Sequence, residues 1–213
     1  MGCVGGSSER RVEVVAVSAA IGSELLFADV TFAVGPGECV VLSGRNGSGK
    51  STLLGCLYGT RQVSSGVVRV GGMTPDERKV GFRRRVSVVL DDSALFDELT
   101  ARQHLDLLLR SFPAVDHRGV EGWLGLAGLD ERADVPALGL SAGQRRRLLL
   151  TGAVARDHDV LLLDEPERAL DTAGREWLIG LIAAERRRGT AVVVASHHGP
   201  LADRVGAARV ELG

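Results

Sequence analysis

Short runs of apolar residues, separated by longer mixed stretches, divide this 213-residue chain into predicted strands and helices. The runs at residues 40–42, 86–90, 160–163 and 192–195 are almost entirely apolar and rich in valine and leucine. Such a run is typical of a strand that is buried on both faces in a parallel sheet. The stretches between the runs are long enough for crossover helices. The pattern therefore predicts an α/β fold with a parallel sheet at its centre.

Composition and charge are those of an ordinary globular chain. Hydrophobic residues make up 45% and charged residues 25%, which fits a single domain covering residues 1–213. The 26 basic and 27 acidic side chains nearly balance, so no global field recruits nucleic acid or an acidic membrane. No apolar run approaches the roughly 20 residues of a membrane-spanning helix. Residues 1–9 lack a signal-peptide pattern, and we expect a frayed tail there.

The three cysteines, Cys3, Cys39 and Cys56, are an odd number and have no metal-ligand spacing. Two of them lie in a predicted strand and a predicted helix. We therefore expect buried, reduced thiols, as in a cytosolic protein.

The segment from residue 44 to residue 52 fits G-x-x-x-x-G-K-[ST], the pattern of a phosphate-binding loop. A predicted strand precedes the segment and a predicted helix follows it, a context that a chance glycine-rich turn lacks. Glycines let the backbone wrap a polyphosphate with its N–H groups inward, and the helix N-terminus adds partial positive charge. Lys50 would reach the β- and γ-phosphates, and the Ser51 hydroxyl would bind Mg²⁺. The predicted nucleotide-binding residues here are Gly44, Arg45, Asn46, Gly47, Ser48, Gly49, Lys50, Ser51 and Thr52.

A second chemical site follows the apolar run at residues 160–163, where Asp164 and Glu165 stand side by side. Ligands of open α/β sheets bind at the carboxyl ends of the strands, which is where these carboxylates fall. Asp164 is placed to hold Mg²⁺, and Glu165 to polarise an attacking water as general base. The alternative is an ordinary solvated turn, because Asp-Glu-Pro is common in turns.

A third segment, Leu-Ser-Ala-Gly-Gln at residues 140–144, narrows the class. With it the chain resembles the ATP-binding subunits of ABC-type ATPases, whose Leu-Ser-Gly-Gly-Gln signature opens a helix that faces the nucleotide of a partner subunit. The resemblance implies that Ser141, Gly143 and Gln144 contact a nucleotide bound by the other subunit. The Ser141 hydroxyl and the backbone N–H groups at Gly143 and the helix end suit a γ-phosphate.

The resemblance covers residues 12 to 212, because the family's other landmarks follow in order. Asp171 falls in a segment similar to the D-loop, which contacts the opposite subunit. His197 follows the apolar run at 192–195 and matches the family's switch histidine, which would hydrogen-bond the γ-phosphate. The implied architecture is a phosphate-loop NTPase of the ABC type. It has a RecA-like core, an antiparallel β part at about 12–34 and 66–85, and a helical insert at about 92–150.

Besides Ala142 in the signature, three further residues depart from the family pattern. Asp91 stands at the usual glutamine, which keeps an oxygen for Mg²⁺ but adds negative charge beside a triphosphate. Asp91 is alternatively an ordinary loop residue after a strand. Ile21 stands where relatives often place an aromatic ring on adenine, so an apolar contact remains without stacking. Arg168 replaces a small residue, with an effect that the sequence does not indicate.

Three arginine triplets, at residues 83–85, 145–147 and 186–188, invite a nucleic-acid interpretation. They are separated along the chain, and they lack the interleaved aromatic residues that stack on bases. Solvated faces and favourable charges at helix C-termini explain them more simply. We therefore expect no nucleic-acid partner.

The resemblance implies an ATPase subunit that uses ATP and Mg²⁺ in a head-to-tail homodimer or heterodimer. It would power a separately encoded membrane permease from the cytoplasmic, inner face of the cell membrane. One alternative is an ABC ATPase of DNA repair or translation, although the chain lacks a long heptad-rich insertion and a second cassette. The other is a regulatory nucleotide-binding subunit with little hydrolysis, which Ile21 and Asp91 favour and Glu165 and His197 oppose.

Overall fold

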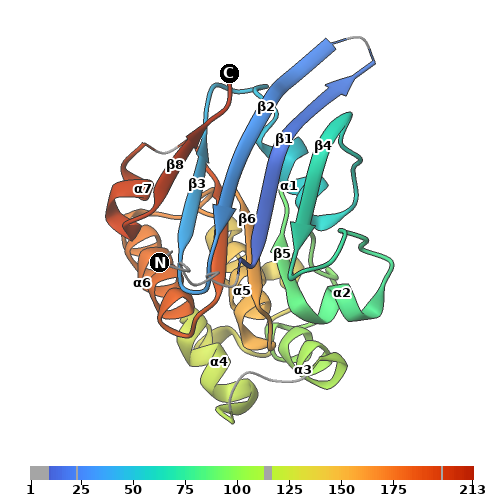
Figure 1. Ribbon diagram of the computed structural model, residues 1–213. Helices are drawn as coiled ribbons and strands as arrows, with labels where there is room; N and C mark the ends of the chain where they lie inside the picture. Colours follow the sequence, from blue (N-terminus) through green and yellow to red (C-terminus); the bar gives the residue numbers. More distant parts are fainter. Residues whose placement is uncertain (1–9, 23, 113–116, 198) are drawn as a thin grey trace, which may run out of the picture.

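The computed structural model describes residues 10–22, 24–112, 117–197 and 199–213 (Figure 1). The predicted tail at residues 1–9, with Cys3, lies outside this part of the chain.

The centre of the fold is a parallel sheet. Its strands are, in spatial order, β5 (Val86–Val89), β6 (Val160–Asp164), β7 (Ala191–Ala195), β3 (Cys39–Ser43) and β8 (Ala208–Glu211). Every neighbouring pair in it is parallel. The four strands predicted from apolar runs are confirmed. The sequence missed the edge strand β8, because Ala-Arg-Val-Glu is mostly exposed and has no buried run.

A second sheet is antiparallel, with β1 (Val12–Ile21) between β2 (Glu24–Val34) and β4 (Ser65–Val70). Val12 pairs with Val34 on one side and with Val70 on the other. This sheet matches the predicted antiparallel β part over residues 12–34. β4 ends at Val70, however, and helix α2 (Val80–Arg85) follows, so the second half of the predicted range 66–85 is not strand.

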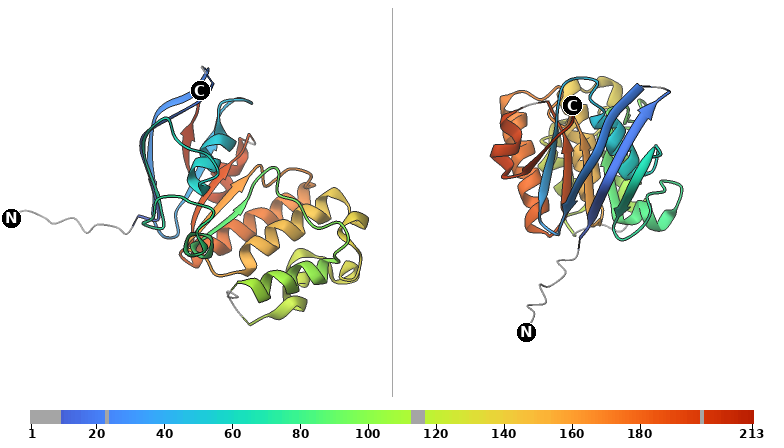
Figure 2. Two further views of the ribbon diagram at one scale, coloured as in Figure 1. Left: turned by 90° about the vertical axis from the view of Figure 1, so that its right-hand side faces the viewer. Right: turned by 45° about the horizontal axis from the view of Figure 1, so that its top comes forward.

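The two faces of the parallel sheet are covered differently, as the alternation along β6 shows. Val160 and Leu162 join the apolar cluster shared with the antiparallel sheet and with helix α1 (Lys50–Tyr58). Leu161 and Leu163 join the opposite cluster, which is formed with the helices on the other face. Figure 2 shows this layering from the side. Both faces of the sheet are buried under apolar side chains, which explains why the strands are continuously apolar.

The remaining helices lie on the side of the second face. They are α3 (Ala101–Ser111), α4 (Gly119–Ala127), α5 (Ala142–Ala155), α6 (Thr172–Arg187) and α7 (Pro200–Val205). Of these, α5, α6 and α7 contact the sheet, and α3 and α4 pack against α5. Short 3₁₀ turns at Asp130–Arg132 and Ala137–Gly139 join α4 to α5. The segment predicted as a helical insert at 92–150 contains α3, α4 and most of α5, and α5 runs on to Ala155 in the core. No helix within the described ranges is both long and apolar enough to cross a membrane.

Candidate functional site

The loop between β3 and α1 has a backbone that only glycine adopts easily at three positions. Gly44, Gly47 and Gly49 have φ values of 145°, 86° and 89°. A Cβ atom on Gly44 would lie 2.2 Å from the backbone oxygen of Leu212, so the loop packs directly against the end of the chain. The loop is therefore held in one shape by backbone contacts, as the sequence pattern requires.

Lys50 lies inside this loop. Lys50 is only 7% exposed, and its ammonium group donates to the carbonyls of Gly44 and Arg45 at 2.9 Å each. The buried Ser48 hydroxyl has no hydrogen-bond partner. A positively charged side chain inside a glycine-rich loop at a helix N-terminus is well placed to bind a chain of phosphates.

A cavity of about 460 Å³ opens over this loop. The loop contributes Asn46, Gly47, Gly49, Lys50, Ser51 and Thr52 to its lining. Segments far apart in the sequence contribute the predicted site residues Ile21, Asp91, Glu165 and His197. Ile21 is 55% exposed at the end of β1 and adds an apolar wall. The structure thus brings most of the predicted nucleotide site together.

The candidate Mg²⁺ ligands border an adjoining cavity of about 490 Å³, which is lined by Ser51, Asp91 and Asp164 among others. Asp164 is 2% exposed, and one of its carboxylate oxygens has no hydrogen-bond partner. Burial raises the pKa of Asp164, and a hydrogen bond from Ser51 opposes that shift. A donor set made only of oxygens, with one buried oxygen unsatisfied, fits a hard cation such as Mg²⁺.

Glu165 follows β6 in a backbone conformation unusual for a residue with a side chain, with φ 44°. Its amide donates to the carbonyl of Ala195 at 2.8 Å, which holds it against the end of β7. The carboxylate pairs with Nδ1 of His197, whose side chain is 65% exposed. Burial and then the neighbouring Glu167 raise the pKa of Glu165, while His197 opposes the shift. Strained backbone and a perturbed carboxylate are features of catalytic sites.

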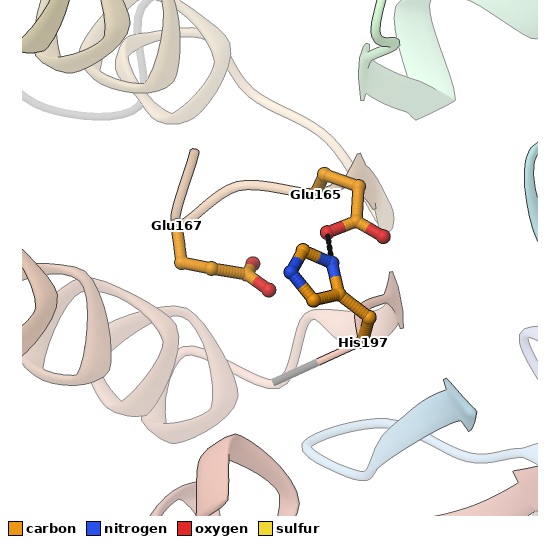
Figure 3. A group of neighbouring side chains, drawn as sticks. All are labelled: Glu165, Glu167 and His197. Atoms are coloured by element: carbon orange, nitrogen blue, oxygen red, sulfur yellow. Dashed lines mark hydrogen bonds and ion pairs between the residues drawn. The ribbon is translucent and has the colours of Figure 1, made fainter. Parts of the chain in front are cut away.

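A further carboxylate lies beside this pair. Glu167 is only 5% exposed, one of its oxygens accepts from the Ser196 hydroxyl, and the other has no partner. The imidazole of His197 lies between the carboxylates of Glu165 and Glu167 (Figure 3). One potential ligand atom from each of the three residues falls within 4.8 Å of the others, so the cluster could hold a cation. It also fixes the exposed histidine beside the candidate base.

The loop after β6 is braced from behind by Arg146 of α5. This guanidinium donates to the carbonyls of Asp164, Glu165 and Pro166 at 2.5, 2.7 and 3.3 Å. The residue is 7% exposed, and burial lowers its pKa. The prediction that the arginine triplets lie on solvated faces is wrong for Arg146.

The other two triplets also contain structural arginines. Arg83 donates to the carbonyl of Glu77 at 2.9 Å, and Arg186 donates to the carbonyl of Gly37 at 3.0 Å. Both residues are half-buried, and they lie in the last turns of α2 and α6, as the prediction of charges at helix C-termini has it. Arg84 and Arg187 are exposed, as predicted.

The residues predicted to face a partner subunit do not line the cavity over the phosphate loop. Ser141 and Gln144 form a reciprocal cap at the start of α5, with hydrogen bonds of 3.2 and 2.9 Å. Gly143 lies in the first turn of the same helix. Asp171 caps α6 by accepting from the amide of Gly174 at 2.7 Å. Their contact with a nucleotide stays a prediction.

Asp91 and Arg168, both noted as departures, form an ion pair. Asp91 follows β5 and Arg168 belongs to the loop after β6. Both line the cavity over the phosphate loop. This ion pair does not test whether Asp91 binds Mg²⁺, which stays a prediction.

Two cysteines are free and buried, as predicted: Cys39 in β3 and Cys56 in α1. Burial raises the pKa of the Cys39 thiol to about 12 and raises that of Cys56 as well.

Sequence reasoning missed Arg146, Glu167 and Leu26, the last of which adds an apolar contact to the cavity wall. A signal existed for Arg146, because it shares a helix face with the buried Leu150 and Val154 four and eight positions on. Glu167 had no such signal, since its hydrogen-bond partner follows a different strand.

The phosphate loop, the carboxylates at the end of β6 and the parallel sheet define a phosphate-loop nucleoside triphosphatase. The sequence profile of the ABC transporter family matches residues 27–168. The chain belongs to the ABC transporter family, of which it is an ATP-binding ATPase subunit.

Curated relatives agree with this placement. The cobalt import ATP-binding protein CbiO of Rhodobacter capsulatus is 40% identical over 190 residues, covering 83% of this chain and 67% of that protein. The cytochrome c biogenesis ATP-binding export protein CcmA of Sphingopyxis alaskensis is 34% identical over 176 residues, covering 83% of this chain and 84% of that protein. The Nod factor export ATP-binding protein I of Paraburkholderia xenovorans is 33% identical, covering 92% of this chain and 66% of that protein. The chain thus spans about two thirds of the length of the cobalt and Nod factor proteins.

A solved structure described as the ATP binding subunit of an ABC transporter has the same fold. It superposes with a TM-score of 0.83 and covers 94% of this chain and 85% of its own, at 24% identity.

Proposed function

We propose that this ATPase powers transport through a separately encoded membrane subunit, with Glu165 as the base of ATP hydrolysis. The observation that carries the proposal is one cavity in which Lys50 and Ser51 face Glu165 and His197. Phosphate-binding groups and a candidate base that share a cavity are what hydrolysis of a terminal phosphate needs.

The phosphate loop would bind the nucleotide. Its backbone N–H groups and the start of α1 would surround the β- and γ-phosphates, and the Lys50 ammonium would exchange its carbonyl partners for phosphate oxygens. Ser51, Asp164 and Asp91 would hold Mg²⁺. Bound Mg²⁺ would neutralise charge on the phosphates. Ile21 and Leu26 would contact the base through apolar surface.

Glu165 would orient and polarise the attacking water. A partly buried carboxylate with a raised pKa is a stronger base than an exposed one, which suits this role. His197 would exchange its contact with Glu165 for one with the γ-phosphate, because its side chain is 65% exposed and already lines the cavity. The histidine would thereby report that ATP is bound.

The working unit would be a head-to-tail homodimer or heterodimer. Ser141, Gly143, Gln144 and Asp171 stand outside the cavity that holds Lys50, which supports a role toward a second subunit's nucleotide. The N-terminus of α5 offers that nucleotide backbone donors and a partial positive charge.

The membrane partner would dock at the helical insert, on the inner face of the cell membrane. An apolar hollow of about 290 Å³ lies between α3 and α5 and includes Phe96 and Leu107, which are 63% and 48% exposed. Such a surface suits an apolar helix face of a permease. Relatives are named for both import and export, so the family does not fix the direction of transport.

The test is Glu165→Gln, which keeps the shape of the side chain and removes the base. We expect ATP turnover to fall on the order of 10²-fold or more while ATP binding is retained. The variant is also expected to accumulate an ATP-bound dimer, visible by light scattering coupled to size exclusion, because closure no longer ends in hydrolysis.

Glu131→Gln is the matched control, since Glu131 is an exposed glutamate of the helical insert. It is expected to hydrolyse ATP like the unmodified protein. Full turnover in Glu165→Gln would remove Glu165 from the mechanism. Unmodified protein that binds ATP without turning it over would instead favour a regulatory nucleotide-binding subunit.

A further inference from the structure

Two residues that the sequence marks as unusual lie against each other at the rim of the nucleotide cavity. Nη1 of Arg168 donates to Oδ1 of Asp91. The two residues follow β5 and β6, which are neighbours in the parallel sheet. Their meeting is therefore a result of topology, because the carboxyl ends of neighbouring parallel strands share one edge.

Arg168 is fixed in the same tight turn as the candidate base. Its amide donates to the carbonyl of Glu165 at 3.0 Å. Glu165, the first residue of this turn, and Ala169, which follows it, both have left-handed backbone, with φ values of 44° and 63°. The turn thus carries Glu165 and Arg168 toward the same cavity, which both residues line.

The Arg168 guanidinium is more exposed than the Lys50 ammonium, which lines the same cavity. The Lys50 ammonium is buried on two backbone carbonyls of the loop. The side chain of Arg168 is 63% exposed, and its Asp91 partner is 48% exposed. An ion pair this exposed is worth only about 0–1 kcal/mol, so a stronger anion can replace the carboxylate.

We propose that Arg168 binds the terminal phosphate of ATP and that Asp91 is the anion which this phosphate displaces. The proposal rests on the proposed nucleotide site. Guanidinium groups bind phosphate through paired, charge-assisted hydrogen bonds, and a triphosphate carries more charge than one carboxylate. Asp91 also borders the cavity of Ser51 and Asp164, so its carboxylate is available for Mg²⁺ once Arg168 leaves it.

The test compares nucleotides with and without the terminal phosphate, by titration calorimetry of the non-hydrolysable analogue AMP-PNP and of ADP. We expect Arg168→Ala to weaken AMP-PNP binding on the order of tenfold, as for the loss of one charged hydrogen bond. ADP binding is expected to change by less than about twofold, and Arg168→Lys to lie between the two proteins, because a point charge remains. Equal weakening of both nucleotides, or no weakening of AMP-PNP, would overturn the proposal.

Asp91→Ala tests the displaced anion in titrations without Mg²⁺, where metal binding does not contribute. Removing the competing carboxylate is expected to tighten AMP-PNP binding several-fold, roughly the effect of one nearby charge at a cavity rim. Unchanged or weaker binding would show that Asp91 does not compete with the phosphate. In the double variant, AMP-PNP binding is expected to match that of Arg168→Ala.

Two controls separate this proposal from the site on which it rests. Arg187→Ala removes an exposed arginine on α6 and is expected to bind both nucleotides normally. Lys50→Ala is expected to lose both nucleotides. If Lys50→Ala bound them normally, the nucleotide site itself would be misplaced, whereas failure confined to Arg168→Ala would concern this residue alone.

Discussion

The two loops that meet in the cavity over the phosphate loop are held in shape in opposite ways. The loop after β3 uses glycines and backbone, and its geometry comes from residues close in sequence. The loop after β6 uses side chains that reach it from elsewhere: Arg146 from α5, Asp91 from the end of β5 and Ser196 from the end of β7. The shape of the first loop is therefore determined by local sequence, and the shape of the second by contacts between segments far apart in the chain.

The difference shows what each loop can do. A backbone cradle presents fixed donors to a ligand, and it changes little as the ligand changes. A loop held by side chains has partners that can be exchanged one at a time, as proposed for His197 and Arg168. Binding would then belong to the first loop and response to the second.

The largest expected effect comes from removing the brace of the second loop. Arg146→Met keeps an unbranched apolar stem but removes the hydrogen bonds of the guanidinium to the carbonyls of Asp164, Glu165 and Pro166. The Glu165 carbonyl still accepts from the Arg168 amide, whereas the other two lose this buried donor, and we expect a loss of about 3–4 kcal/mol in the free energy of unfolding. Arg146→Lys is expected to restore part of it. Urea unfolding of both variants measures the effect.

Arg145→Ala is the control for this prediction, because Arg145 is the preceding residue of the same helix and its guanidinium makes only a long hydrogen bond, of 3.5 Å to the carbonyl of Leu138, among the described residues. It is expected to change stability by less than about 0.5 kcal/mol. Equal stability of Arg146→Met and Arg145→Ala would mean that the loop after β6 holds its shape without the guanidinium.

A comparison within the first loop gives the next largest effect. Gly44→Ala meets the backbone oxygen of Leu212 at 2.2 Å, whereas Gly47→Ala meets nothing within 4 Å. Gly47 has φ 86°, near the left-handed region, where a side chain costs about 1 kcal/mol, whereas Gly44 has φ 145°, where a side chain costs about 1–3 kcal/mol. We expect Gly44→Ala to lose about 2–3 kcal/mol in total and Gly47→Ala about 1 kcal/mol, measured by thermal unfolding. Equal losses of stability in the two variants would show that the backbone at Leu212 shifts to accommodate the added methyl group.

The smallest expected effect is a gain. Ala169 has φ 63° and is exposed, so Ala169→Gly relieves left-handed strain without losing packing. The greater freedom of glycine in the unfolded chain offsets most of this, leaving a stabilisation of about 0.5 kcal/mol. Ala173→Gly, on the exposed face of α6, is the control and is expected to lose about 0.5–1 kcal/mol. A loss at Ala169 as large as at Ala173 would mean that the turn stores no strain.

The same contrast explains what the sequence could predict. The phosphate loop, the strand before it, the helix after it, and the carboxylates Asp164 and Glu165 follow from local patterns of glycine, apolar runs and charge. The ion pair of Asp91 with Arg168 and the hydrogen bond between Glu167 and Ser196 do not, because they depend on which strands are neighbours. The edge strand β8 lacks a buried run, so its place was equally invisible.

The position of β3 in the sheet has a consequence for how the protein is made. Leu42 pairs with Ala195 of β7 on one side and with Val210 of β8 on the other. The strand that carries the phosphate loop is synthesised well before both of its neighbours, β7 and β8. Until then its apolar residues have no partners, which makes the growing chain slow to fold and prone to association. A ribosome-bound chain that stops before residue 191 is therefore expected to be unable to hold nucleotide, however complete its phosphate loop.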